Sequence, residues 1–210
     1  SLEWEDGKLT AGKHAAKEKN NLQLRRDSDL SIKFSGLITK KILSNELIKS
    51  FALPKKIHGT IFSKSTSGMK YGRHIDNAYM SSGRADLSFT VFLNCKKKYE
   101  GGALSIQGLN SEEKFKLDAG EIIIYPSTYL HSVEKVIDGE RLVFIGWIES
   151  YVKSIEEREY LFDLDAAARS LLAKYGRSEE VDLIYKSYSN FLRRLGNWIS
   201  NSTSIILYID

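Results

Sequence analysis

Two histidines and one aspartate carry the clearest chemical signal in the sequence. His74 and Asp76 are two residues apart, and His131 lies 55 positions beyond Asp76, after a strongly apolar run. On a β-strand alternate side chains point to the same face, so this spacing places His74 beside Asp76. Two imidazoles and one carboxylate can occupy one face of an octahedral Fe(II) and leave three positions open. The three residues therefore predict an iron site, although His-x-Asp alone more often reflects a local hydrogen bond.

The composition is that of an ordinary globular protein. Of 210 residues, 42% are hydrophobic and 28% charged, which suits one domain or one domain with an appendage. The net charge of +4 is too small by itself to indicate nucleic-acid binding. The single cysteine, Cys95, excludes an internal disulfide and favours a reducing, cytoplasmic location. No apolar run reaches the roughly 18 residues of a membrane span, and no signal peptide is visible.

Helical periodicity marks both ends of the chain. Between residues 28 and 51, apolar side chains recur at three- and four-residue steps, which predicts an N-terminal helix packed on a sheet. Ser44 is a candidate cap for its second half. From residue 154, two apolar stripes predict packing helices, with the break at Gly176 and an N-cap at Ser178. Residues 13–21 are rich in lysine and asparagine and predict a segment that buries little.

The middle of the chain reads as short strands separated by turn residues. Strands with turns at this density predict a sandwich or barrel and not an α/β fold. The expected strands are 56–63, 87–94, 103–106, 115–117, 121–125, 132–136 and 142–148. We therefore expect a domain over residues 1–150, with its barrel core at about 56–150, and a helical extension over 151–210.

Arg141 is a fourth candidate, ten residues beyond His131. If Ile137–Gly139 forms a three-residue hairpin loop, Lys135 faces Arg141, and Arg141 shares one face with His131. A two-residue turn would instead point Arg141 away. An arginine holds a terminal carboxylate through two parallel hydrogen bonds, which a lysine cannot do. We predict that Arg141 binds such a group; the alternative is a surface turn residue.

Seven segments carry a resemblance to a known family. They read LTAGKHAAKEKNNLQL, YGRHIDNA, RADLSFTVFLN, YEGGALSIQ, LDAGEIIIYPSTYLHSVEKV, RLVFIGWIES and LFDLDAAARSL. Together they resemble the bacterial PKHD-type hydroxylases, Fe(II)- and 2-oxoglutarate-dependent dioxygenases related to prolyl 4-hydroxylases, from about Trp4 to Leu195. The resemblance implies a mainly β fold with flanking helices: a double-stranded β-helix (jelly-roll) core, an N-terminal helix on the sheet and a C-terminal helical extension.

The resemblance also implies roles for individual residues. The implied catalytic residues are His74, Asp76, His131 and Arg141, of which the first three bind Fe(II). The implied co-substrate pocket contains Arg141, which binds 2-oxoglutarate, with Tyr71, Thr90 and Trp147. In this family an unactivated C–H bond is hydroxylated while succinate and CO2 are released, and ascorbate is an accessory reductant. The expected substrate is a prolyl residue of a peptide or a small molecule.

The sequence departs from the family pattern at two places near the predicted site. Lys64-Ser65 stands near the position of a family tyrosine, and Ala103 replaces an acidic residue that normally follows the paired glycines. We expect these changes to alter contacts with substrate or co-substrate. The resemblance further leads us to expect more chain before Trp4.

Two other functions remain open from sequence. One is a non-catalytic jelly-roll binding module, for example for a sugar, in which the histidines are structural. The other is an oxidative nucleic-acid demethylase, but such relatives carry a second arginine six residues after the first, where Trp147 stands here. We therefore expect neither nucleic acid nor membrane as a partner. The C-terminal helices either cover the barrel or form a homodimer face, and the sequence does not decide between these roles.

Overall fold

The computed structural model describes residues 4–10, 15–108 and 110–197. Backbone contacts divide the chain into two compact units, Ser1–Ser150 and Tyr151–Asp210. The first is mainly β with helices at its N-terminal side, and the second is helical, so the predicted fold class is confirmed. Among the described residues, no helix combines the length and apolar character that a membrane span requires.

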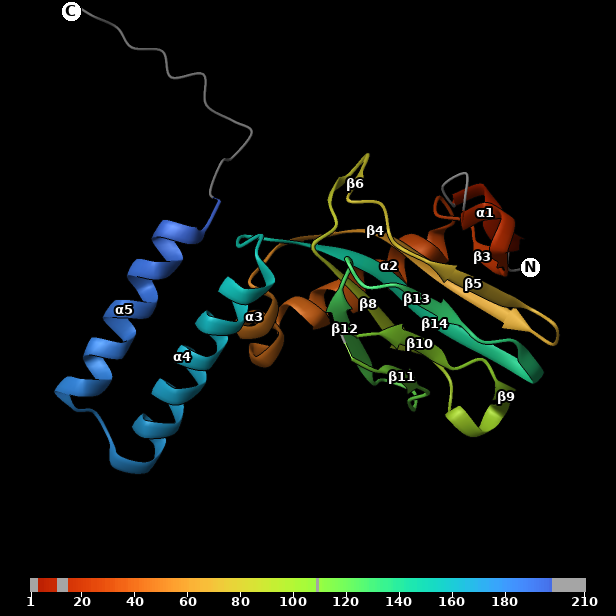
Figure 1. Cartoon of the computed structure of the whole chain (residues 1–210). Coiled ribbons are helices and arrows are strands. Elements are labelled where there is room, and N and C mark those ends of the chain that lie inside the picture. Colours follow the sequence, from red (N-terminus) through yellow and green to blue (C-terminus); the bar gives the residue numbers. More distant parts are fainter. Residues whose placement is uncertain (1–3, 11–14, 109, 198–210) are drawn as a thin grey trace, which may run out of the picture. The chain divides into compact units, whose positions relative to one another are not determined.

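Two antiparallel sheets build the first unit (Figure 1). In the described part of the chain, the larger sheet has the order β1-β3-β4-β14-β8-β12, with β9 also paired to β14. Its strands are β1 (Trp4–Asp6), β3 (Leu22–Leu24), β4 (Pro54–Thr66), β8 (Leu87–Phe92), β9 (Tyr99–Gly101), β12 (Ile122–Pro126) and β14 (Val136–Ser150).

The smaller sheet has the order β11-β10-β13-β5-β2 in the described residues. Its strands are β2 (Lys19–Asn20), β5 (Lys70–His74), β10 (Leu104–Gln107), β11 (Glu112–Phe115) and β13 (His131–Val133). A separate hairpin of β6 (Tyr79–Met80) and β7 (Gly83–Arg84) follows β5. Short pieces of helix complete the unit: η1 (Gly7–Thr10), α1 (Ala15–Glu18) and η2 (Lys96–Lys98).

The larger sheet has one apolar and one polar face because its strands alternate. On β4, Phe62 packs into an apolar core, whereas Ile61 and Ser63 line a cavity on the opposite face. On β14, Phe144 belongs to the same core and Val143 to the cavity wall. Alternate residues of a strand face opposite sides, so this pattern places the cavity between the two sheets and the main core outside it.

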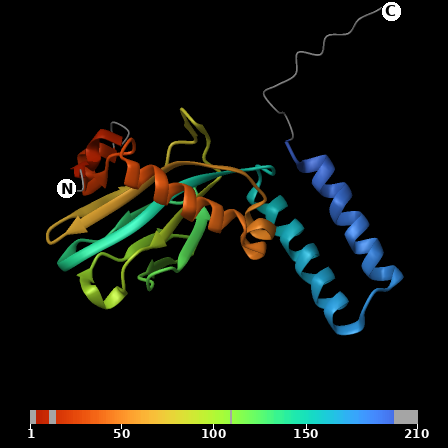
Figure 2. The same cartoon turned by 180° about the vertical axis from the view of Figure 1, so that it is seen from behind.

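Two helices cover the outer face of the larger sheet (Figure 2). They are α2 (Asp29–Leu43) and α3 (Glu46–Ala52), which together fill the predicted helical region. The expected cap is wrong by one residue. Ser44 ends α2, whereas Asn45 begins α3, because its extended backbone lets its side chain accept from the Ile48 amide at 3.0 Å.

The predicted hairpin after His131 is also wrong. The segment from Val136 to Ser150 is one continuous strand, β14, and β13 belongs to the other sheet. Val136 pairs with Gly101 and Gly139 with Tyr99, so β9 occupies the place expected for the strand before the turn. Gly139 does have a positive φ of 80°, but within the β9 pairing and not in a hairpin loop. Consequently His131 and Arg141 lie on different sheets.

The second unit is a pair of helices, α4 (Ile155–Tyr175) and α5 (Glu179–Leu195). Gly176, with φ of 78°, follows α4, and its amide donates to the Leu172 carbonyl. Ser178 begins α5 by accepting from the Val181 amide at 3.3 Å. The predicted break and cap are therefore confirmed.

Candidate active site

Three candidate ligands meet where the inner strands β5 and β13 of the smaller sheet end and begin. His74 ends β5 and lies directly opposite His131 on β13, so the two imidazole centroids are 4.2 Å apart. Asp76 lies just beyond the end of β5, and its Oδ2 is 3.7 Å from His131 Nε2. One ligand atom from each of the three residues lies within 4.8 Å of the other two. A single cation can therefore contact all three.

The hydrogen bonds of both histidines leave one ring nitrogen free for a metal. His74 Nδ1 is 2.8 Å from the Gly72 carbonyl, and His131 Nδ1 is 3.0 Å from the Tyr129 carbonyl. A carbonyl only accepts, so each Nδ1 carries the proton and each Nε2 keeps its lone pair. Burial, followed by the neighbouring His131, lowers the pKa of His74. Its imidazole is therefore neutral near pH 7, as metal binding requires.

Two donors fix the carboxylate of Asp76. Ser88 Oγ donates to Asp76 Oδ2 at 2.6 Å, and Trp147 Nε1 donates to the same oxygen at 2.9 Å. Ser88 and Trp147 are opposite one another on β8 and β14. The larger sheet therefore orients Asp76, although Asp76 follows β5, a strand of the smaller sheet. Both bonds fall on Oδ2, which leaves Oδ1 open to a cation.

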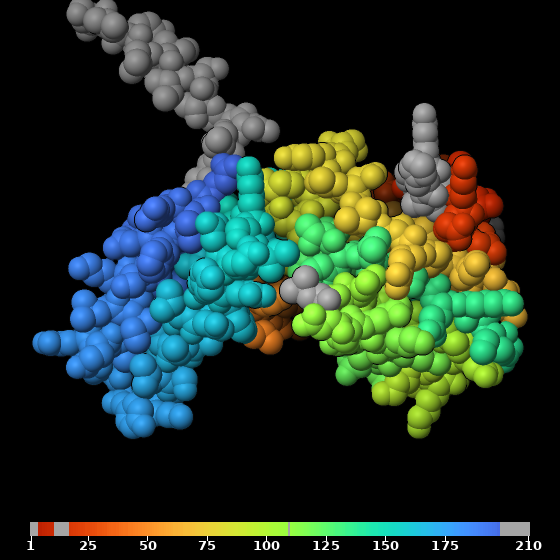
Figure 3. Space-filling view, viewed as in Figure 1, coloured from red at the N-terminus to blue at the C-terminus, as the bar shows by residue number. Residues whose placement is uncertain are grey.

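Tyr71, Thr90 and Trp147, predicted to line the co-substrate pocket, all line one cavity of about 910 Å³ with the three ligands. Tyr71 stacks on His74, with 3.7 Å between ring centroids. Figure 3 shows the segment from β5 to β7, in yellow, beside the green segment from β10 to β13.

Arg141 lines the same cavity from the larger sheet. It is 3% exposed, and its Nε has no hydrogen-bond partner among the described residues. The hydroxyl of Tyr99 is likewise buried without a hydrogen-bond partner among the described residues. Burial raises the pKa of this hydroxyl, and the charge of Arg141 opposes that effect. Buried polar groups are rarely left unpaired. An anionic ligand would satisfy the guanidinium, so the side chain fits a carboxylate of 2-oxoglutarate.

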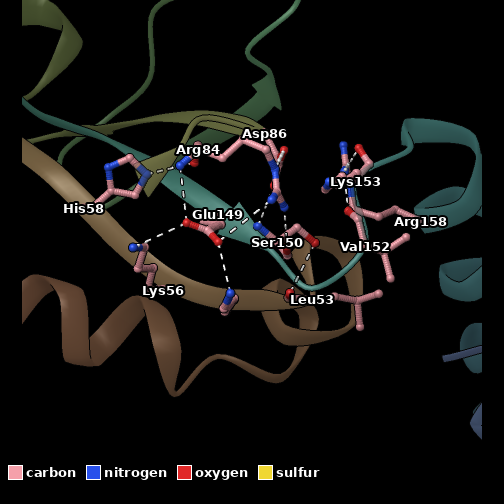
Figure 4. A network of polar contacts seen from close by, with 11 residues as sticks. Leu53, Lys56, His58, Arg84, Asp86, Glu149, Ser150, Val152, Lys153 and Arg158 are labelled. Atoms are coloured by element: carbon pink, nitrogen blue, oxygen red, sulfur yellow. Dashed lines mark hydrogen bonds and ion pairs between the residues drawn. The ribbon is translucent and has the colours of Figure 1, made fainter. Parts of the chain in front are cut away.

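His58 shows how a structural histidine differs in this protein. Its Nε2 is 2.9 Å from the Arg84 carbonyl (Figure 4). Its Nδ1 is 2.9 Å from Ser82 Oγ. The carbonyl must accept, so Nε2 donates and Nδ1 accepts from the serine. Both nitrogens are occupied within the chain, and His58 is not part of the three-residue cluster.

Comparison with known proteins decides the family. The family model described as the 2OG-Fe(II) oxygenase superfamily matches residues 60–149, and that of the PKHD-type hydroxylase C-terminal domain matches residues 156–197. A PKHD-type hydroxylase from Prochlorococcus marinus strain MIT 9215 is 76% identical over 195 residues, which cover 93% of this chain and 88% of that protein. The chain belongs to the PKHD-type hydroxylases.

More distant relatives agree with this result. A PKHD-type hydroxylase from P. marinus strain NATL2A is 61% identical over 93% of this chain and 89% of its own length. A crystal structure of a Pseudomonas putida prolyl-4-hydroxylase has a TM-score of 0.51 at 17% identity, covering 70% of this chain and 78% of that one. This last likeness concerns the fold alone. As a 2OG-Fe(II) oxygenase, the hydroxylase is a 2-oxoglutarate-dependent dioxygenase that uses Fe(II).

The two departures from the family pattern have different positions in the hydroxylase. Ser65 lines the cavity and is the cross-strand neighbour of Arg141. Lys64 points elsewhere: its Nζ lies 3.6 Å from a Glu140 carboxylate oxygen and 4.4 Å from the Trp4 ring centroid. Ala103 contributes a carbonyl that accepts from the Glu134 amide.

Sequence reasoning did not assign Ser88, Tyr99, Tyr125 or Lys19 to the site. Ser88 shares strand parity with Thr90, which is a signal that could have found it. The Tyr125 ring meets His131 edge-on, with 5.2 Å between centroids, and its position five residues after Gly120 gave no hint of this. Lys19 lies in the segment expected to bury little, yet Lys19 and Asn21 are buried, so that expectation is wrong at these two residues, whereas Lys17, Glu18 and Asn20 are exposed.

Proposed function

We propose that this hydroxylase binds Fe(II) through His74, Asp76 and His131 and 2-oxoglutarate through Arg141, and hydroxylates an unactivated C–H bond with release of succinate and CO2. The observation that carries the proposal is the convergence on one cavity of the three ligands and a buried arginine whose Nε has no hydrogen-bond partner among the described residues. The bound iron and co-substrate supply the O2-dependent oxidation.

The protein's own contribution is orientation and exclusion of water. Ser88 and Trp147 hold the Asp76 carboxylate, and backbone carbonyls hold the two imidazoles in the tautomer that ligation needs. Arg141, at 3% exposure, offers its charge in a medium of low dielectric, where a carboxylate gains most from pairing. These fixed groups place the co-substrate before reaction begins.

We further propose a peptide or a small molecule as the substrate, a prolyl residue being one candidate. Residues 1–150 would form the dioxygenase domain and residues 151–210 a C-terminal helical extension. A homodimer, a cytoplasmic location and a need for ascorbate stay predictions.

The direct test measures conversion of 2-oxoglutarate to succinate by the full chain with Fe(II) and O2. We expect turnover that requires the metal, and His74→Ala should reduce it at least about 1000-fold, because catalysis depends on a complete ligand set. His58→Asn is the matched control for metal affinity, measured by Mn(II) calorimetry, since His58 lies outside the cluster. Undiminished turnover in His74→Ala would refute the assignment.

A further inference from the structure

The N-terminal segment builds one wall of the cavity. Thr10 from η1, Lys19 from β2 and Arg26 beyond β3 all line it. β2 pairs with β5 so that Lys19 lies opposite Tyr71, the residue whose ring stacks on His74. One aromatic ring therefore lies between Lys19 and the proposed metal site.

Lys19 is a buried cation without an anionic partner. Only 5% of its surface is exposed, and its Nζ donates to Thr10 Oγ1 at 3.1 Å and lies 5.1 Å from the Tyr71 ring centroid. Within the described ranges, no carboxylate forms an ion pair with it. An ammonium group has three donor hydrogens, so donors remain for a ligand. Burying an unpaired charge is costly, and an anion bound here would recover part of that cost.

The other charges of the wall have the same sign. Apart from Asp76 and Arg141, which the proposed iron and 2-oxoglutarate sites use, the charged residues among the described lining are Lys19, Arg26 and Arg73. Arg73 has a weak contact with Glu112 at 3.7 Å, and Arg26 is exposed. A cavity whose remaining charges are all positive attracts anionic ligands.

Lys19 keeps its charge at neutral pH. Burial lowers its pKa to about 8, with Asp76 opposing that effect and Arg26 adding to it. The ammonium form therefore predominates at pH 7 and is available for an ion pair.

We propose that the substrate of this hydroxylase carries a carboxylate group, which Lys19 binds together with Arg26 beside Tyr71. The inference deepens the proposed function and rests on it, because it takes the Arg141 side of the cavity as filled by 2-oxoglutarate. A free or C-terminal carboxylate and an acidic side chain of a peptide share this chemistry.

The test compares probes that differ only in charge, using the full chain. The first pair is N-acetyl-L-proline and its uncharged amide; the second is the peptide Ac-Ala-Pro-Glu-NH2 and its Gln counterpart. Saturation-transfer NMR measures their affinities without metal and again with Zn(II) and N-oxalylglycine, a 2-oxoglutarate analogue. We expect the charged member of one pair to bind at least about tenfold more tightly than its neutral partner. The pair that shows the preference identifies the source of the carboxylate.

Variants then test whether Lys19 causes the preference for the charged probes. Lys19→Met should abolish it, Lys19→Arg should retain part of it, and Lys97→Met, at an exposed residue of η2, should leave it unchanged. If Lys19→Met does not fold, Arg26→Met, at an exposed position, should still reduce the affinity about threefold.

Three results would overturn the inference. They are equal binding of charged and neutral probes, absence of binding by both charged probes, and a Lys19→Met variant that weakens N-oxalylglycine while keeping the preference. Failure to bind metal or N-oxalylglycine would count against the proposed function alone, because the charge preference is also measured without metal.

Discussion

Two arginines of the same unit, one half-buried and one buried, have opposite surroundings. Arg84, at the end of β7, donates from Nε and Nη2 to Asp86 at 2.6 and 2.7 Å and from Nη2 to the Ser150 carbonyl at 2.8 Å (Figure 4). Arg141 is more deeply buried, yet its Nε has no partner in the described chain. A charge that is paired within the chain serves the fold, whereas one left unpaired points to a ligand.

The network around Arg84 is a closed set of polar contacts. Burial alone would raise the pKa of Glu149, but the Arg84 amide, Lys55 and Lys56 outweigh burial and lower it. The Ser150 amide donates to Asp86 at 2.8 Å. These contacts join β4, β7 and β14, and none of the residues that make them lines the cavity.

The largest effect on folding is expected for Arg84→Met. The change leaves Asp86 and Glu149 without the guanidinium, and loss of one partner of this partly buried pair is expected to cost about 2 kcal/mol of unfolding free energy. Chemical denaturation at pH 7 measures this, with Lys97→Met as a control that changes stability by less than about 0.5 kcal/mol. A loss below about 1 kcal/mol would show that the network contributes little.

Arg141→Met should have the opposite effect on the ligand-free protein. Removal of a buried, unpaired charge is expected to raise the unfolding free energy by about 1 kcal/mol. At the same time the affinity for 2-oxoglutarate should fall about 100-fold, because a charge-assisted bidentate contact is lost. Calorimetry measures the affinity for Mn(II), which should be unchanged, and the affinity for 2-oxoglutarate in the presence of Mn(II). Destabilisation equal to that of Arg84→Met would erase the contrast between the two arginines.

Trp147→Phe tests a residue that supports a ligand without contacting metal. It removes one of the two donors to Asp76 Oδ2 and keeps an aromatic ring in the wall. Loss of such an outer hydrogen bond typically weakens metal binding about 10-fold or more. The variant should keep its unfolding midpoint, and unchanged Mn(II) affinity would show that Ser88 alone orients the carboxylate.

The smallest effect is expected for Tyr99→Phe. Its hydroxyl is buried without a partner near Arg141, so its removal should not destabilise the ligand-free protein. If the hydroxyl helps to hold the co-substrate carboxylate, the Kd for 2-oxoglutarate should rise about fivefold. An unchanged Kd would show that Arg141 binds the co-substrate carboxylate without help from the Tyr99 hydroxyl.

The sequence predicted most of the longer strands, the main helices and the three candidate ligands because each depends on residue type and local spacing. Two expected strands were wrong: 115–117 overlaps β11 at Phe115 alone, and 132–136 spans the end of β13 and the start of β14. Period-two patterns place strands, and His74, Asp76 and His131 are chemically distinctive. The position of Arg141 depended on which strand pairs with which. The chain passes from β13 in the smaller sheet to β14 in the larger one, so these two strands do not form a hairpin. The start of β14 pairs with β9 instead, and local turn rules therefore predicted the wrong partner strand.

Burial of the N-terminal segment could not be predicted for a related reason. Lys19 and Gln23 look like surface residues by type, and nothing near them in sequence marks a cavity. They are buried because β2 pairs with β5 in one sheet, at Tyr71, and β3 pairs with β4 in the other, at Ser63. Long-range pairing, and not propensity, determines that outcome.

A crystal structure of the full chain soaked anaerobically with Mn(II) and 2-oxoglutarate tests the central claim most directly. The account predicts one metal ion bound by His74, Asp76 and His131, with the far carboxylate of the diacid paired to Arg141 and Lys19 still free for a substrate. A metal bound elsewhere, or a diacid whose far carboxylate lies on Lys19 while Arg141 has no ligand, would contradict it.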